Sequence, residues 1–72
     1  MNKIIILVVK GTEYNKTLKW NSVEEFKESL VNGCRLPNSD DIIVEASIDD
    51  NIIDIGNTFE VTLEKMRMIL DL

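Results

Sequence analysis

The sequence predicts an α+β domain in which helices pack on one face of a small antiparallel sheet. Three observations support this fold class. Several segments carry β-branched runs or alternating apolar residues, which are typical of strands, and one carries a capping box followed by apolar residues at helical spacing. The length of 72 residues leaves room for one core, so residues 1–72 are expected to form a single compact domain. The element order expected along the chain is ββαβββα.

The first two strands are expected to form a hairpin. Residues 3–9 are a run of mostly β-branched residues, typical of a central strand with neighbours on both sides. Residues 13–20 alternate, and the apolar side chains of the core-facing side are Tyr14, Leu18 and Trp20. Gly11 supplies a turn between the segments, while Lys16 and Lys19 suit an edge strand protected against pairing with other chains.

A helix is predicted to begin at Ser22, which can form a capping box with Glu25. The apolar residues that follow fall on one helical stripe, which should pack on the sheet: Val23, Phe26, Leu30 and Val31. Gly33 suits the left-handed conformation that ends a helix, and Pro37 opposes its resumption. The helix should therefore end near residue 33.

A second hairpin is expected to follow the helix. Residues 42–48 alternate and predict a third strand, whose inward side chains are Ile42, Val44, Ala46 and Ile48. Its outward side chains are Ile43, Glu45 and Ser47. Asp49, Asp50 and Asn51 are typical of a turn, after which residues 52–55 would form the returning strand.

The C-terminal segment supports two interpretations. Gly56-Asn57 is a turn signal, and residues 58–63 alternate, which predicts a fifth strand followed by a helix capped by Thr62. The same segment has helical spacing at Phe59, Leu63, Met66 and Leu70. A capping box of Asn57 with Glu60 would then begin one longer helix, giving the order ββαββα. The fifth strand is favoured because residues 58–62 contain four good strand formers.

The composition opposes a catalytic or metal-binding function. The chain has no histidine and one cysteine, Cys34, which excludes histidine-based triads, histidine or cysteine zinc sites and an internal disulfide framework. Cys34 is interpreted as a small apolar residue at the helix end. Asp41 and Asp49 flank a seven-residue segment and lie about 26 Å apart if it is a strand, so they cannot share one ion. We therefore expect no enzyme activity, no metal and no other cofactor.

The sequence also indicates a cytoplasmic protein without a membrane segment. The apolar run of residues 4–9 is shorter than the hydrophobic region of a signal peptide, and much too short to span a bilayer. A small fold without disulfides suits a reducing compartment.

Acidic residues are concentrated in one part of the chain. Residues 1–35 carry six basic and four acidic side chains, whereas residues 36–64 carry eight acidic and none basic. Seven of these eight are the candidate partner-binding residues: Asp40, Asp41, Glu45, Asp49, Asp50, Asp54 and Glu60. They form a negative surface only if folding keeps the lysines of the first hairpin away from them. The alternative is a solvated surface that maintains solubility.

These patterns lead us to expect a non-enzymatic protein-binding module, such as an intracellular inhibitor or adaptor whose acidic residues meet a basic partner. Small acidic phage-encoded inhibitors of nucleic-acid-handling enzymes are an analogous class. One alternative is a nucleic-acid-binding module that uses the lysine-bearing hairpin with Tyr14 and Trp20, although net charge of -5 opposes binding to phosphates. Another is a structural homodimer built from apolar residues outside the assigned core: Ile43, Met68 and Leu72.

Overall fold

The computed structural model describes residues 3–11 and 13–72, and it confirms the predicted fold class. The chain forms a four-stranded antiparallel sheet and two helices in the order ββαββα, which is the alternative with the longer C-terminal helix. The elements are β1 (Ile5–Lys10), β2 (Asn15–Trp20), α1 (Val23–Asn32), β3 (Ile42–Ile48), β4 (Asn51–Ile52) and α2 (Phe59–Leu70).

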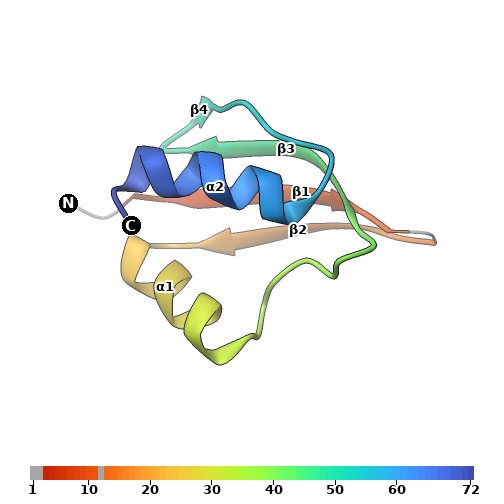
Figure 1. The fold of residues 1–72 in the computed structure, drawn as a ribbon, viewed down its shortest axis with the longest axis horizontal. Coiled ribbons are helices and arrows are strands. Elements are labelled where there is room, and N and C mark those ends of the chain that lie inside the picture. Colours follow the sequence, from red (N-terminus) through yellow and green to blue (C-terminus); the bar gives the residue numbers. More distant parts are fainter. Residues whose placement is uncertain (1–2, 12) are drawn as a thin grey trace.

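Strand β1 lies inside the sheet, whose strand order is β2-β1-β3-β4. It pairs with β2 on one side and with β3 on the other, as the β-branched run predicts. Both helices lie on one face of the sheet: α2 lies over the strands and α1 lies beside β2 (Figure 1). On that face the side chains of β1 are completely buried, and they are Ile5, Leu7 and Val9.

Helix α1 begins and ends where the sequence predicts. The Ser22 hydroxyl accepts a hydrogen bond from Glu25 N at 3.2 Å. Gly33 has φ of 68°, the left-handed conformation that closes the helix without strain in a residue lacking Cβ. The Glu25 carboxylate accepts from Asn21 N rather than from Ser22 N, so the capping box reaches one residue further back.

The buried side of α1 centres on Phe26, whose ring meets the Trp20 ring edge-on with 4.9 Å between centroids. The buried indole Nε1 of Trp20 donates to Ser29 Oγ at 2.8 Å, which satisfies both polar groups inside the core. Val31 lies about 140° around the helix from Phe26 at 3.6 residues per turn. The prediction that Val31 packs on the sheet is therefore wrong, and its side chain is 85% exposed.

Strand β3 contains a β-bulge that changes its predicted alternation. The pairing with β1 shifts register between Val8 and Val9 and skips Val44. As a result Ile43 is buried, whereas Ile42 and Val44 face solvent, which is the reverse of the prediction for all three. The predicted inward residues that the structure confirms are Ala46 and Ile48.

Residues 58–63, expected as a fifth strand, instead lead into and begin α2. Thr58 is the N-cap, and its hydroxyl accepts from Val61 N at 3.4 Å, so neither Asn57 nor Thr62 starts the helix. Helical spacing buries three side chains of α2 against the sheet: Thr62, Met66 and Leu70. Packing of this face outweighs the strand propensity of the individual residues, because most helical stability in proteins comes from such burial.

The Trp20–Ser29 hydrogen bond yields a stability prediction. Ser29→Ala removes the acceptor and leaves a buried indole N–H without a partner, which should lower the free energy of unfolding by about 1–3 kcal/mol. Urea unfolding followed by tryptophan fluorescence measures the change, since Trp20 is the only tryptophan. Glu28→Ala, an exposed neighbour on α1, is the matched control and should change stability little. Equal stability of the two variants would contradict the prediction.

Candidate protein-binding surface

The strand order keeps the opposite charges of the sequence apart in space. Strand β2, which carries Lys16 and Lys19, is one edge of the sheet, and β4 is the other. Strand β1 separates β2 from β3, so about 10 Å lies between the latter two. The ion pair that the described residues form joins Arg35 Nη1 to Glu25 Oε1 at 3.7 Å, outside both groups. The lysines of β2 therefore lie apart from the acidic side chains of β3 and β4, although Lys16 interacts electrostatically with Asp41 just before β3.

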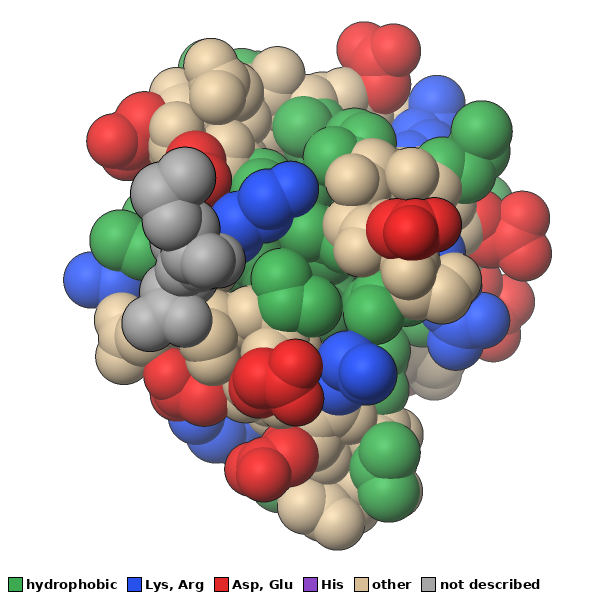
Figure 2. Space-filling model, turned by 90° about the vertical axis from the view of Figure 1, so that its left-hand side faces the viewer, with side chains coloured by type: hydrophobic (Ala, Val, Ile, Leu, Met, Phe, Trp, Pro, Cys, Tyr) green, Lys and Arg blue, Asp and Glu red, His purple; other side chains and the backbone are tan. Residues whose placement is uncertain are grey.

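The seven candidate acidic residues are divided between several places. Asp40 and Asp41 precede β3, and Asp49 and Asp50 follow it, so a seven-residue strand of about 23 Å separates the two pairs. The other three lie within β3, after β4 and in the first turn of α2, and they are Glu45, Asp54 and Glu60. Figure 2 shows the end where β3 and α2 finish, and its described side chains mix acidic, basic and hydrophobic groups.

Asp41 is held inside the structure by hydrogen bonds. Its Oδ1 accepts from the Tyr14 hydroxyl at 2.8 Å, and its Oδ2 accepts from Asn38 N at 2.9 Å, while the residue is buried. The bond from Asn38, followed by the bond from Tyr14, lowers the pKa of the Asp41 carboxyl. The bond to Asp41 raises the pKa of Tyr14. Asp41 therefore ties the loop before β3 to the first hairpin rather than forming part of an open surface.

Tyr14 is exposed, although the alternation of residues 13–20 places it in the core. It precedes the first paired residue of β2, and its ring covers Gly11 so closely that a Cβ at position 11 would clash with ring carbons. Lys16 Nζ lies 5.3 Å from the centre of the ring. Trp20, the other aromatic residue of the hairpin, is completely buried, so it is not available to stack on a nucleic-acid base.

Asp49 and Asp50 form the turn between β3 and β4. Both have left-handed backbone conformations, with φ of 52° and 67°, which aspartate tolerates better than most residues. Asp49 Oδ1 accepts from Ile4 N at 3.0 Å, and Asp49 N donates to Ile4 O at 2.9 Å. Asp49 therefore fixes the turn to the start of β1, and Asp50 is exposed. The returning strand is shorter than predicted and ends at Ile52 instead of residue 55.

Exposed hydrophobic side chains gather between β4 and α2. A depression there is lined by Ile52, Ile53, Asp54, Lys65, Met68 and Ile69. Met68 is 85% exposed and Ile52 is 73% exposed. Met68 also lines an adjoining depression along α2, together with Glu60, Val61, Glu64 and Lys65. We name the two depressions together the β4–α2 surface, defined by Ile52, Ile53, Asp54, Glu60, Val61, Glu64, Lys65, Met68 and Ile69.

The β4–α2 surface combines an apolar centre with a mainly acidic rim. Such an arrangement is typical of protein interfaces, where a hydrophobic core is surrounded by polar groups. The sequence had singled out Met68 as an apolar residue outside the core and Asp54 as part of the acidic segment. It did not associate them, because they are brought together only when the chain after β4 returns along α2. Of the other apolar residues singled out, Ile43 is buried and Leu72 lies in a separate depression with Val31.

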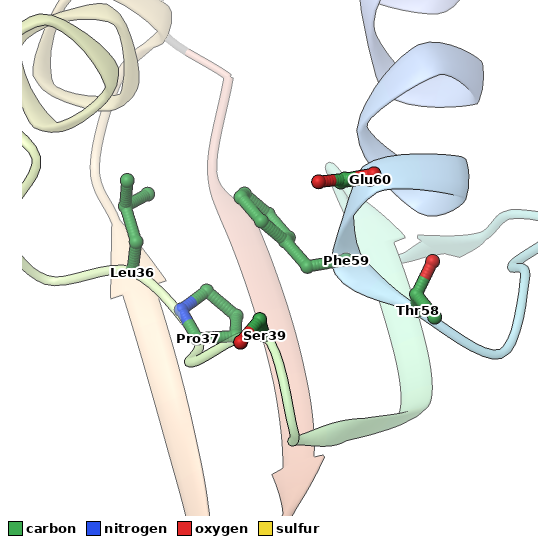
Figure 3. Close-up of a pocket in the computed structure, with 6 residues that line it drawn as sticks. All are labelled: Leu36, Pro37, Ser39, Thr58, Phe59 and Glu60. Carbon is green, nitrogen blue, oxygen red and sulfur yellow. The ribbon is translucent and has the colours of Figure 1, made fainter.

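A further pocket lies between the loop before β3 and the start of α2 (Figure 3). Its lining residues are Leu36, Pro37, Ser39, Thr58, Phe59 and Glu60. The Phe59 ring extends from α2 toward Leu36 and Pro37, so the walls are mainly apolar (Figure 3). Glu60 is the only ionisable side chain in the lining, and it has no second acid or base beside it for proton transfer within this pocket.

The described part of the chain contains neither a metal-binding cluster nor a membrane-spanning helix. Among residues 3–11 and 13–72, no group of three or more cysteine, aspartate or glutamate side chains has the geometry to hold a metal ion. No helix in these ranges is both long and apolar enough to cross a membrane. Cys34 is exposed just after α1 and forms no disulfide.

Comparisons of the chain with protein-family models, with curated proteins and with solved structures found no match. The class that the fold defines is a small two-layer α+β domain.

The Tyr14–Asp41 contact predicts a pH-dependent contribution to stability. The pKa of the Asp41 carboxyl is lower in the folded than in the unfolded chain, so its ionised form stabilises the fold at pH values above the pKa of the unfolded chain. This contribution is lost as the pH falls through the pKa that the carboxyl has in the folded state. Tyr14→Phe removes one of the bonds that lower this pKa. We expect Tyr14→Phe to be less stable than the wild type near neutral pH, with a difference that narrows below about pH 4. Urea unfolding at several pH values measures it.

Thr17→Ala is the control for this comparison, since Thr17 is an exposed residue of the same hairpin without an ionisable partner. Its stability difference from the wild type should not depend on pH. If the stability difference between Tyr14→Phe and the wild type stayed constant from neutral to acidic pH, the Tyr14 hydroxyl would not act through the Asp41 carboxylate.

Proposed function

We propose that this domain is a non-enzymatic protein-binding module that contacts its partner through the β4–α2 surface. The observation that supports the proposal is the juxtaposition of Met68 and Ile52, both largely exposed, with Asp54 in one depression. A partner that fits this surface has an apolar contact area bordered by lysine or arginine side chains. By binding without chemistry, such a module acts as an inhibitor or an adaptor, and its expected place is the cytoplasm.

The charges around the surface favour a basic partner. Asp54 lines the first depression, Glu60 and Glu64 line the second, and Lys65 is the single basic residue in either lining. Asp50 extends the negative charge along the same edge of the sheet. The basic strand β2 lies at the opposite edge, so its lysines do not screen these carboxylates at close range. Association with a basic partner should therefore be faster at low salt.

The apolar centre supplies the contact area. Met68 is an unbranched and polarisable side chain, which adapts to irregular partner surfaces. Ile52 and Ile69 flank it from β4 and α2. Their exposure costs solvation free energy in the free domain, and a partner that covers them recovers it at roughly 25 cal/mol per Å² of apolar area. The refined site therefore keeps Asp50, Asp54 and Glu60 of the acidic set and adds hydrophobic residues.

The proposal predicts that Met68→Ser disrupts partner binding while Val31→Ser does not. Both side chains are 85% exposed on helices, so neither substitution removes core packing. The tagged domain is used to capture proteins from its own cell lysate at low and high salt. We expect that the wild type and the Val31→Ser variant capture the same basic protein and that the Met68→Ser variant does not capture it. With that protein purified, Met68→Ser should bind on the order of tenfold more weakly.

The charge contribution is tested by combining Asp50→Asn, Asp54→Asn and Glu60→Gln. Asparagine also tolerates the left-handed conformation of Asp50, and all three side chains are exposed, so the substitutions remove charge without breaking the turn. Binding of the triple variant should be weaker at low salt and should depend less on salt than that of the wild type. The proposed surface would be overturned if Met68→Ser still bound the partner, or if Val31→Ser lost the partner to the same extent as Met68→Ser.

A further inference from the structure

The face of the sheet opposite the helices is uncovered and has an apolar centre. Its central side chains, which alternate with the core residues of β1, are Ile6 and Val8, and both remain partly exposed. Ile4 extends this row by one position, and it is also exposed. On β3, Ile42 and the bulged Val44 face solvent beside it. A sheet face that is solvated in the functional state normally carries polar residues at these positions.

Opposite charges stand on the two sides of this apolar row. Lys19 of β2 lies opposite Ile6, and Glu45 of β3 lies opposite Val8. The register places both on the uncovered face, because their partners in β1 point there. Two strand spacings, about 10 Å, separate β2 from β3, so Lys19 and Glu45 do not pair within one chain. The face therefore carries Lys19 on one side of its apolar centre and Glu45 on the other, and the exposed Lys10 ends the β1 row between them.

We propose that the uncovered sheet face binds the same face of a second copy of this chain, forming a homodimer. The two-fold axis lies parallel to β1 and above it. This symmetry packs the Ile6–Val8 row of one copy against the same row of the other, and it places β2 of each copy over β3 of its partner. Lys19 of one copy then faces β3 of the other across the roughly 10 Å between packed sheets, and it lies about 7 Å, two residues along the strand, from the level of Glu45.

The charges select this axis over the other two-fold arrangement. An axis in the plane of the sheet but perpendicular to the strands places β2 over β2 and β3 over β3. Lysine-bearing strands would then face each other, as would the two strands that carry Glu45. The parallel axis instead forms two equivalent Lys19–Glu45 contacts, one on each side of the apolar centre. This complementarity is the reason to assign a second copy rather than a different protein.

The size of the face indicates a reversible dimer. Three strands of about six residues and the short β4 cover at most roughly 19 by 20 Å, or about 760 Å² for the two copies together, which is below the roughly 1,200 Å² of stable complexes and typical of weak, transient contacts. We therefore expect a weak dimer, with a dissociation constant below about 1 mM. Ile52 of β4 lies opposite Ser47 and so adjoins this face, whereas Met68 and Ile69 belong to α2 on the other side of the sheet. The dimer needs no partner protein, so its test is independent of the proposed function.

The first experiment measures the mass of the full chain by sedimentation equilibrium over a wide concentration range. We expect the wild type and Val31→Lys to form dimers and Val44→Lys to be monomeric, with a dissociation constant raised at least about tenfold. Val44 and Val31 are both exposed, so each lysine is accommodated without loss of core packing, and circular dichroism confirms that the fold is retained. A wild type that is monomeric up to about 1 mM, or a Val44→Lys variant that still dimerises, would overturn the proposal.

The second experiment uses charge reversal. In a Lys19→Glu dimer, the new glutamate of one copy meets Glu45 of the other. In a Glu45→Lys dimer, the new lysine meets Lys19 of the other copy. Each variant alone should therefore dimerise on the order of tenfold more weakly than the wild type. When the two variants are mixed, the two substituted positions form one contact of opposite charge, and the native Lys19 and Glu45 form the other. The mixture should therefore form a heterodimer, with an affinity that falls as salt rises. Failure of the mixed variants to associate more tightly than either alone would overturn the assigned symmetry.

Discussion

The position of β1 inside the sheet is the constraint on which the other features depend. Its odd-numbered residues Ile5, Leu7 and Val9 are completely buried under the helices, so they organise the core. Its pairing with β3 on one side and β2 on the other separates the basic strand from the acidic edge. Two even-numbered residues of the same strand, Ile6 and Val8, are also aliphatic, which leaves an apolar row on the second face. One hydrophobic segment thus determines the core, the charge distribution and the uncovered surface.

Much of the fold could be predicted because its signals are local. The capping box at Ser22, the glycine at position 33 and the largely apolar β1 act through contacts within a few residues. Two features were missed because they depend on distant residues. The bulge at Val44 arises from the pairing of β3 with β1, and it moves Ile43 into the core. The start of α2 contains good strand formers, but burial of Thr62 and Met66 against the sheet makes the helix more stable.

The candidate site was predicted less completely than the fold. The acidic segment is continuous in the sequence, yet a seven-residue strand of about 23 Å carries its two ends apart. Asp41 could not be recognised as structural, because its partner Tyr14 lies 27 residues away. Met68 was recognised as an unusual apolar residue, whereas its proximity to Ile52 depends on how α2 lies along β4. Local charge and hydropathy identify candidate residues, but tertiary contacts decide which of them share a surface.

The two surfaces proposed for this domain reinforce each other through geometry. A short chain buries only about 60% of the surface that it exposes when unfolded, so some apolar residues must remain outside, and isolated ones such as Val31 need no function. Here most of the others gather in two places, the uncovered sheet face and the β4–α2 surface. A two-fold axis parallel to β1 places the β4 edges of the two copies on opposite sides of the dimer. In the proposed dimer each copy would present its β4–α2 surface outward, and a partner with repeated binding sites would be held by both at once. Because the second contact would be intramolecular, a weak dimer of weak binding sites would attain an avidity well above that of either copy alone.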